Sequence, residues 1–212
     1  MFLLIIYSQK ENFSMKRLLL TSTGFSNKRF ASLFLEKINK DAADIKVLFV
    51  PTAATDDGAR EMLPCCYQDL TNVGILPENI FIYELRHLIS QGHNKSNFPQ
   101  HFRLLSVKEM ENYDAVYFCG GDEAHLLNEV NRTGFKEILK SAVENGLFYI
   151  GASAGAVIAA KNLPNNLGFI KNRIYVHCSK GTPCGKLPTD KNIYLTDRQA
   201  VWIEGDTYEI IE

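Results

Sequence analysis

The sequence predicts one α/β domain, a three-layer α/β/α sandwich in which a mainly parallel sheet lies between two layers of helices. Short apolar runs alternate with longer segments whose apolar residues recur every three or four positions, so strands should alternate with helices. The strand-like runs are apolar on both faces, which is typical of parallel strands covered on each side. A chain of 212 residues can bury one good core, and no repeat, low-complexity tract or linker divides residues 15–212.

The first half of the chain is expected to form three strands and two long helices. Strands are predicted over 17–23, 46–53 and 79–85, and helices over 27–40 and 58–73. In the first helix Phe30, Phe34 and Ile38 fall on one face, as a helix packed against a sheet requires. The polar stretch 86–106 that follows is expected to be a surface excursion.

The second half begins with the same alternation and ends in short strands. Strands are predicted over 114–121 and 147–151, and helices over 107–113, 123–146 (with a break near Gly134) and 154–162. The last third carries short strand-like runs over 173–178, 192–196, 199–205 and 207–211. The turn "EGDT" between the last two runs predicts a C-terminal β-hairpin.

Composition excludes several classes of function. A net charge of −1 argues against a nucleic-acid surface, and the early apolar run 2–7 is far shorter than the roughly 20 residues of a membrane span. The five cysteines are odd in number and form no C-x-x-C pair, which favours reduced thiols and a cytoplasmic protein. We expect no metal, no cofactor, no nucleic-acid partner and no membrane partner, and a homodimer stays an open expectation.

Residues 1–14 are expected to be an N-terminal extension or a misplaced start. The run 2–7 lacks the basic residues before it and the cleavage site after it that a signal peptide needs. Met15 directly precedes "KRLLLTST", the first predicted strand. The predicted domain is therefore 15–212, and mass spectrometry of the native protein would show whether residues 1–14 are present.

The stretch "GASAG" (151–155) matches the G-x-S-x-G pattern of a nucleophile elbow. A buried strand precedes it and an alanine-rich helix follows, as that sharp turn demands. The turn would lift the hydroxyl of Ser153 out of the sheet and place the amide of Ala154 at a helix N-terminus. The alternatives are a small residue at a tight strand–helix junction and a phosphate cradle.

Gly120 and Gly121 end the strand before the elbow strand. The carboxyl ends of adjacent parallel strands meet at one edge of a sheet, where ligands bind in open α/β folds. The amides of Gly121 and Ala154 could therefore form an oxyanion hole. The alternative is that this segment is only a turn and an N-cap, in which Asp122 caps the next helix. Both can hold at once, and Gly120 and Asp122 are expected to line the site.

A serine hydroxyl needs a base, and His177 is the best placed of the five histidines. It follows the strand-like run "RIYV", just beyond the elbow helix. His87, His93 and His101 lie in the polar excursion, and His125 lies on the helix after the glycine pair. An α/β-hydrolase esterase is disfavoured. In such an enzyme a strand that carries the acid lies between the serine and the histidine, and here His177 follows Ser153 too closely to leave room for it.

Three segments, "FCGGD-x-x-x-LL", "YIGASAGAVI" and "IYLTDRQAVWI-x-G", give the chain a family resemblance. Over 15–212 it resembles the peptidase E (aspartyl dipeptidase) family of serine peptidases, to which cyanophycinase is related. The resemblance implies a class I glutamine amidotransferase-like, flavodoxin-like fold and small peptide substrates. It also implies Ser153 as nucleophile, His177 as base, and Gly121 with Ala154 as oxyanion donors. The amidotransferases carry cysteine at the elbow, so serine favours peptide hydrolysis.

The sequence departs from that family in the acid of the triad. The dipeptidases place it between serine and histidine, but no Asp or Glu lies between Ala154 and Val176. Three outcomes follow: a Ser–His dyad, a later acid (Asp190, Asp197 or Glu204), or a peptide-binding module without turnover. The arginine-containing segment associated with acidic substrates is replaced by "CSKGTPCGKLPTD", which leaves the substrate side chain open.

Overall fold

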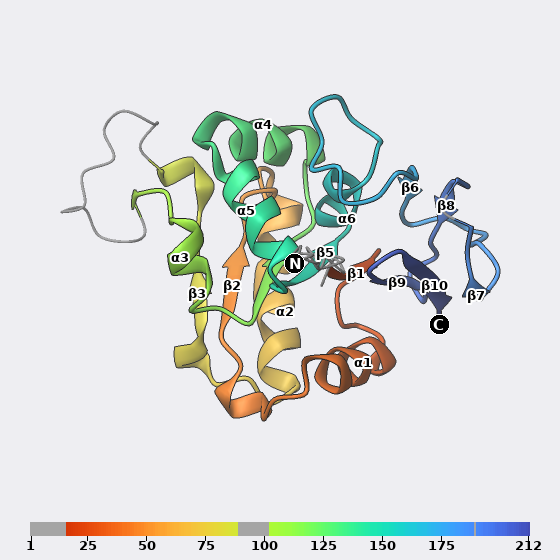
Figure 1. The fold of residues 1–212 in the computed structure, drawn as a ribbon, viewed down its shortest axis with the longest axis horizontal. Helices are drawn as coiled ribbons and strands as arrows, with labels where there is room; N and C mark the ends of the chain where they lie inside the picture. Colours follow the sequence, from red (N-terminus) through yellow and green to blue (C-terminus); the bar gives the residue numbers. More distant parts are fainter. Residues whose placement is uncertain (1–15, 89–101, 189) are drawn as a thin grey trace, which may run out of the picture.

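The computed structural model describes residues 16–88, 102–188 and 190–212. Its main sheet contains β1 (Arg17–Thr21), β2 (Val47–Val50), β3 (Ile80–Ile82), β4 (Ala115–Phe118), β5 (Phe148–Ala152), β7 (Gly185–Lys186), β9 (Ala200–Glu204) and β10 (Thr207–Ile211). The order is β3-β2-β4-β5-β1-β9-β10-β7, so β3 and β7 are at opposite ends of the sheet (Figure 1). Strands β1 to β5 are parallel, and β9, β10 and β7 add antiparallel pairs.

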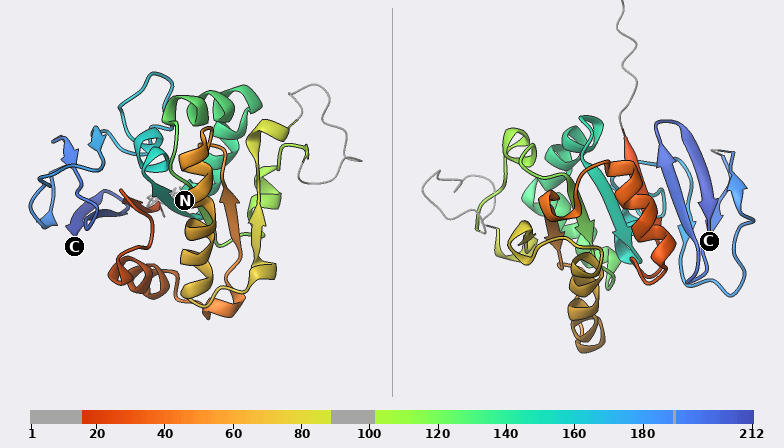
Figure 2. Two further views of the ribbon diagram at one scale, coloured as in Figure 1. Left: turned by 180° about the vertical axis from the view of Figure 1, so that it is seen from behind. Right: turned by 90° about the horizontal axis from the view of Figure 1, so that it is seen from below.

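Helices cover both faces of this sheet. They are α1 (Lys28–Ile38), α2 (Asp57–Asn72), α3 (Val107–Met110), α4 (Glu123–Thr133), α5 (Phe135–Glu144) and α6 (Ala154–Ala159), with short 3-10 turns η1 (Ala42–Asp44), η2 (Pro77–Asn79) and η3 (Leu85–His87). Figure 2 shows the helices on the two sides of the sheet in two further views. Side chains of β1 alternate: Leu19 packs in the core under α1 and α2, and Leu18 and Leu20 pack in the core under α3 to α6. The predicted three-layer sandwich is confirmed.

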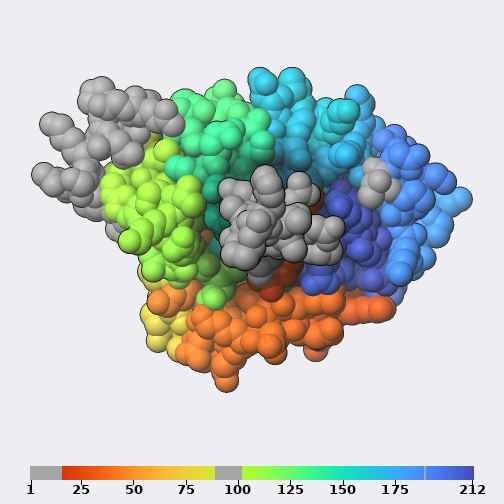
Figure 3. Space-filling model, viewed as in Figure 1, coloured from red at the N-terminus to blue at the C-terminus, as the bar shows by residue number. Residues whose placement is uncertain are grey.

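The C-terminal segment completes the sheet rather than forming a separate unit. Strand β9 lies antiparallel to β1, with Thr21 opposite Ala200, and forms the predicted hairpin with β10. The indole of Trp202 is 5% exposed and its ring centroid lies 5.3 Å from that of Phe148 in β5. Figure 3 shows this segment, in dark blue, next to the lighter-blue atoms that form one end of the molecule.

A second, small sheet lies beside the main one. Strands β6 (Ile174–Tyr175) and β8 (Ile193–Tyr194) run parallel, and the rings of Tyr175 and Tyr194 stack with centroids 5.0 Å apart. Both short strands fall within predicted runs. The sequence did not predict β7, whose two residues are defined only by their pairing with β10.

The remaining expectations divide between described and undescribed residues. The predicted helix break occurs at Gly134, which has a φ of 78°. None of the five cysteines is in a disulfide. No helix among the described residues is long and apolar enough to cross a membrane. The proposed extension 1–14, and His93 and His101 in the polar excursion, lie outside the described residues.

Candidate active site

Ser153 occupies the sharp turn that the G-x-S-x-G pattern predicts. It lies between β5 and α6 with φ 47° and ψ −106°, a conformation that costs an L-residue roughly 1–3 kcal/mol. Its amide donates to the carbonyl of Thr21 at 2.9 Å, which ties the turn to β1. A Cβ added at Gly151 would lie 2.6 Å from the carbonyl carbon of Gly155, so the close return of the chain requires glycine.

His177 lies within hydrogen-bond distance of the serine. Its Nε2 is 3.1 Å from Ser153 Oγ. The backbone of His177 also has a positive φ, 56°. Its amide donates to the buried hydroxyl of Ser22 at 3.2 Å, and that hydroxyl donates to the carbonyl of Thr196 at 3.1 Å. Ser22, in the loop after β1, therefore connects the histidine to the segment that precedes β9.

Asp197 provides a carboxylate on the far side of the imidazole. Its Oδ1 lies 2.7 Å from His177 Nδ1. The small parallel sheet brings His177 and Asp197 together, because β6 leads into His177 and β8 leads into Asp197 at the same edge of that sheet. The two segments stay paired beyond the strands: the amide of Cys178 donates to the carbonyl of Leu195 at 2.9 Å.

The other two late acids do not contact the imidazole. Glu204 lies opposite Arg17, at the beginning of β1 and hence at the other edge of the sheet, where it pairs with Lys37 at 3.3 Å. Neither Glu204 nor Asp190 bonds to His177 within the described residues. Of the three acids that the sequence left open, Asp197 is the one beside the histidine.

These contacts fix the proton positions on the imidazole. A carboxylate can only accept, so in the neutral imidazole His177 Nδ1–H donates to Asp197 and Nε2 is left to accept from the Ser153 hydroxyl. This is the tautomer in which a histidine can act as general base towards a serine. The side chains of His177 and Asp197 are 50% and 62% exposed, so the arrangement is open to solvent.

The glycine pair lies against the elbow, as predicted. A Cβ on Gly120 would lie 3.1 Å from Ser153 Cβ. Gly121 has φ 134°, and a Cβ there would lie 2.1 Å from the carbonyl oxygen of Ala53. Within the described residues, no hydrogen bond uses the amide of Gly121 or of Ala154. Both amides beside Ser153 are therefore free to donate to a ligand.

Asp122 has the capping role foreseen for it. Its Oδ1 accepts from the amide of His125 at 2.8 Å, at the beginning of α4. Gly120 and Gly121 line the cavity next to Ser153, but Asp122 does not. The contribution of Asp122 is to hold the glycine turn in place through α4.

A cavity of about 230 Å³ adjoins the serine, and one helix supplies much of its wall. Ala59, Met62, Leu63 and Cys66 of α2 line it opposite the elbow. Sequence reasoning missed these residues. Their spacing of i, i+3, i+4 and i+7 predicts one helix face, but it does not say that the face borders the glycine pair.

Three ionisable groups lie in or behind this wall. A hydrogen bond with the Cys119 thiol lowers the pKa of Cys66, and burial raises the pKa of Cys119. Burial also raises the pKa of Asp69, whose Oδ2 accepts from the amide of Phe25 at 2.9 Å. Burial therefore favours the neutral forms of Cys119 and Asp69, and His177 is the residue of the lining that can become cationic.

Comparison with known proteins gives the family. A model of Peptidase family S51 matches residues 18–168, more than half of the chain. The chain belongs to Peptidase family S51. The S51 match contains Gly121, Ser153 and Ala154, whereas His177 and Asp197 follow it.

Individual relatives agree with the S51 assignment. An uncharacterized peptidase of Listeria monocytogenes is 30% identical over 149 residues, which is 70% of this chain and 63% of that protein. The match thus spans less than two thirds of the relative's length. Peptidase E of Streptomyces coelicolor is 46% identical over 57 residues, 27% of this chain and 24% of that one.

A solved structure shares the S51 fold along almost the whole chain. A putative peptidase E of Listeria monocytogenes EGD-e superposes with a TM-score of 0.69 at 24% identity, covering 93% of this chain and 98% of that one. A peptidase from an acI-B1 Actinobacterium gives 0.64 at 21% identity, covering 94% and 88%. The likeness supports the fold beyond residue 168, where His177 and Asp197 lie.

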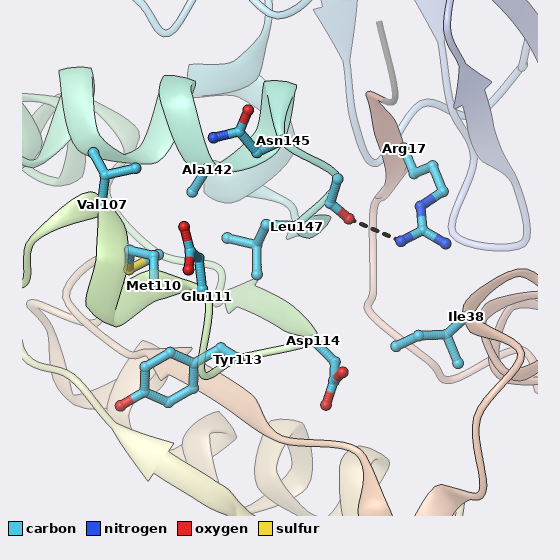
Figure 4. Close-up of a pocket in the computed structure, with 11 residues that line it drawn as sticks. Arg17, Ile38, Val107, Met110, Glu111, Tyr113, Asp114, Ala142, Asn145 and Leu147 are labelled. Carbon is cyan, nitrogen blue, oxygen red and sulfur yellow. Dashed lines mark hydrogen bonds between the residues drawn. The ribbon is translucent and has the colours of Figure 1, made fainter.

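The S51 domain has a further cavity, of about 260 Å³, at the opposite edge of the sheet (Figure 4). Arg17, the first residue of β1, lines it together with Glu111 and Asp114, and donates to the carbonyl of Gly146 at 2.8 Å. None of the predicted site residues lines this cavity. Ser153, His177, Gly120 and Gly121 instead line the cavity at the carboxyl ends of the parallel strands.

Proposed function

We propose that this chain is a serine-type peptidase that hydrolyses small peptides through an acyl-enzyme on Ser153. The observation that carries the proposal is the hydrogen-bonded series Ser153–His177–Asp197 on a strained strand-to-helix turn. Membership of Peptidase family S51, and relatives that are named peptidases, support this class of reaction.

In the first half-reaction, Ser153 Oγ attacks the carbonyl carbon of the scissile peptide bond. Its proton passes to His177 Nε2, and Asp197 stabilises the imidazolium that forms. The negative charge on the former carbonyl oxygen is taken by the amides of Gly121 and Ala154. The C–N bond then breaks, the leaving amine takes the proton from Nε2, and the acyl group stays on Ser153 as an ester.

In the second half-reaction, water replaces the amine. His177 Nε2 takes one proton from the water as its oxygen attacks the ester carbonyl, and the same two amides hold the second oxyanion. Collapse of this tetrahedral intermediate breaks the ester bond, and the proton returns from His177 Nε2 to Ser153 Oγ. The product is a free carboxylic acid, and the enzyme is restored.

One observation bears on the alternative, a binding module without turnover. That alternative came from the interval without acids after Ala154, and Asp197 now occupies the position that an orienting acid needs. The cavity of about 230 Å³ is smaller than the 300–1,000 Å³ typical of sites for drug-sized ligands. It suits one side chain of a small peptide, which supports small peptides as substrates.

The proposal is tested by digesting a library of di- and tripeptides with the wild type, Ser153→Ala and His177→Ala. Ser32→Ala, at an exposed serine of α1 away from the site, is the matched control. We expect cleavage by the wild type and the control, and none by the two site variants. Binding of peptides without cleavage by the wild type, or cleavage that survives in Ser153→Ala, would refute the peptidase assignment.

A further inference from the structure

Apolar side chains of α2 form part of the wall of the cavity beside Ser153. We propose that this cavity receives an uncharged apolar side chain, of about the size of leucine or methionine, from the residue whose carbonyl Ser153 attacks. This inference rests on the proposed function, because it assigns the specificity of the same site. It departs from the acidic substrates of the aspartyl dipeptidases that the sequence resembles.

The position of the cavity follows from the residues that it shares with the reacting centre. Ser153 and Gly121 both line it, so a carbonyl held between the serine hydroxyl and the Gly121 amide lies at its mouth. The substituent on that carbonyl then extends towards α2, where Ala59, Met62 and Leu63 form the wall. Alkyl and thioether surface there favours an apolar side chain through burial of apolar area.

Charge argues against an acidic substrate. His177 is the one described residue lining the cavity that can become cationic, and its imidazole already bonds to Ser153 and Asp197. No lysine or arginine of the described residues lines the cavity, so a carboxylate there would lose its hydration without such a partner. Asp69 follows Cys66 by one helical turn, and its carboxylate acts electrostatically on the Cys66 thiol. Burial favours the neutral form of the Asp69 carboxyl, so Asp69 offers a substrate carboxylate no compensating positive charge.

A basic substrate is disfavoured for the matching reason. No aspartate or glutamate is among the described residues that line the cavity, and the Asp69 carboxylate accepts a hydrogen bond from the Phe25 amide instead of facing it. A lysine ammonium would be desolvated without a direct partner. Volume sets the upper limit, because about 230 Å³ holds a single side chain.

The test uses peptide aldehydes that differ only in the residue carrying the aldehyde: Leu, Met, Asp or Lys. Each forms a hemiacetal, in which Ser153 Oγ bonds to the aldehyde carbon and the hydroxyl proton ends on the former carbonyl oxygen. The readout is protection of Ser153 from a fluorophosphonate probe, which needs no turnover. We expect Leu and Met aldehydes to protect at concentrations at least about tenfold lower than Asp or Lys aldehydes.

A charge substitution tests whether the cavity itself sets the preference between the aldehydes. Met62 is 57% exposed, so Met62→Arg can fold and places a cation at the rim. It should improve protection by the Asp aldehyde relative to the Leu aldehyde by about tenfold or more. Gln68→Arg is the control: it adds the same charge on α2 at an exposed position outside the cavity, and the ratio should not change.

The outcomes separate the two proposals. Equal or better protection by Asp or Lys aldehydes in the wild type overturns the apolar assignment while Ser153 remains the nucleophile. An equal shift in Met62→Arg and Gln68→Arg overturns it as well, because the effect would then be general electrostatics. Failure of the probe to label Ser153 without any aldehyde refutes the proposed function itself, and this inference with it.

Discussion

His177 uses both ring nitrogens and its backbone amide to hold its place, although half of its side chain is exposed. Nε2 faces Ser153, Nδ1 faces Asp197, and the amide donates to Ser22. The imidazole of a histidine on the surface would otherwise rotate and change tautomer freely. The activation that we propose for Ser153 therefore depends on Asp197.

The role of Asp197 is tested by Asp197→Asn. An asparagine can donate to Nδ1 and so stabilise the wrong tautomer, which leaves Nε2 protonated and unable to accept from Ser153. We expect kcat/KM on a cleaved peptide to fall by about 10²–10⁴, with the fold unchanged by circular dichroism. Asp190→Asn, at an exposed acid in the same segment, should retain wild-type activity. Asp197→Asn with activity within about twofold of wild type would contradict the triad.

Single residues were predictable where a pattern also defines the local backbone. G-x-S-x-G implies its own turn, so Ser153 could be placed from the sequence, and His177 follows a recognisable strand. Asp197 could not be separated from Glu204, because the choice depends on which way β9 runs. An antiparallel β9 begins at the edge where Ser153 lies, and this puts Asp197 there and Glu204 at the other edge.

At the scale of elements, short segments position the site while the long elements form the core. The small parallel sheet of β6 and β8 carries the chain into His177 and Asp197, and the loop after β1 supplies Ser22. The long helices were predicted to within a few residues because their apolar spacing is repeated over several turns. The first strand is shorter than predicted: its continuation turns away at Ser22, whose hydroxyl bonds to the Leu195 and Thr196 carbonyls.

The ion pair between Arg103 and Glu109, at the short helix α3, should make the stability of the protein depend on pH. Ser106 caps α3 in a capping box with Glu109, and the Arg103 guanidinium beside Glu109 lowers the pKa of that carboxyl from 4.5 to about 2. Because the pKa is lower in the folded state, the contribution of this group is full above pH 4.5 and is lost as the pH falls towards 2. We expect the free energy of unfolding of the wild type to fall across that window.

The variant that tests this is Glu109→Gln, followed by urea denaturation at several pH values. It should be less stable than wild type at neutral pH, and its stability should fall less steeply below pH 4.5. Glu111→Gln, at an exposed acid with no ion pair in the described part of the chain, serves as control and should keep the wild-type slope. Equal slopes in wild type and Glu109→Gln would contradict the assignment.

At the scale of the whole molecule, the two ends of the described chain pair with each other in one sheet. β9 comes from the last part of the sequence and pairs with β1 from the first, and Trp202 of β9 packs on Phe148 of β5. The alternation of strand and helix was enough to predict the fold class. The sequence alone could not show that the last third extends the same sheet, because short strands specify their partners weakly.

Because the first and last strands pair in one sheet, we expect a single cooperative unfolding transition. Trp202 is the only tryptophan of the chain, so its fluorescence reports on the C-terminal hairpin, whereas far-ultraviolet circular dichroism reports mainly on the helices. In urea both signals should give the same midpoint, as two-state unfolding of one domain requires. A hairpin transition at a distinctly lower urea concentration would show that residues 199–212 unfold on their own.

The central claim is that His177 activates Ser153 as a nucleophile, and the rate of labelling by a fluorophosphonate measures this directly. We predict that the wild type is modified on the peptide containing Ser153, that Ser153→Ala is not modified there, and that His177→Ala reacts at least about 10³-fold more slowly. Labelling of His177→Ala at the wild-type rate, or no labelling of the wild type, would contradict the account.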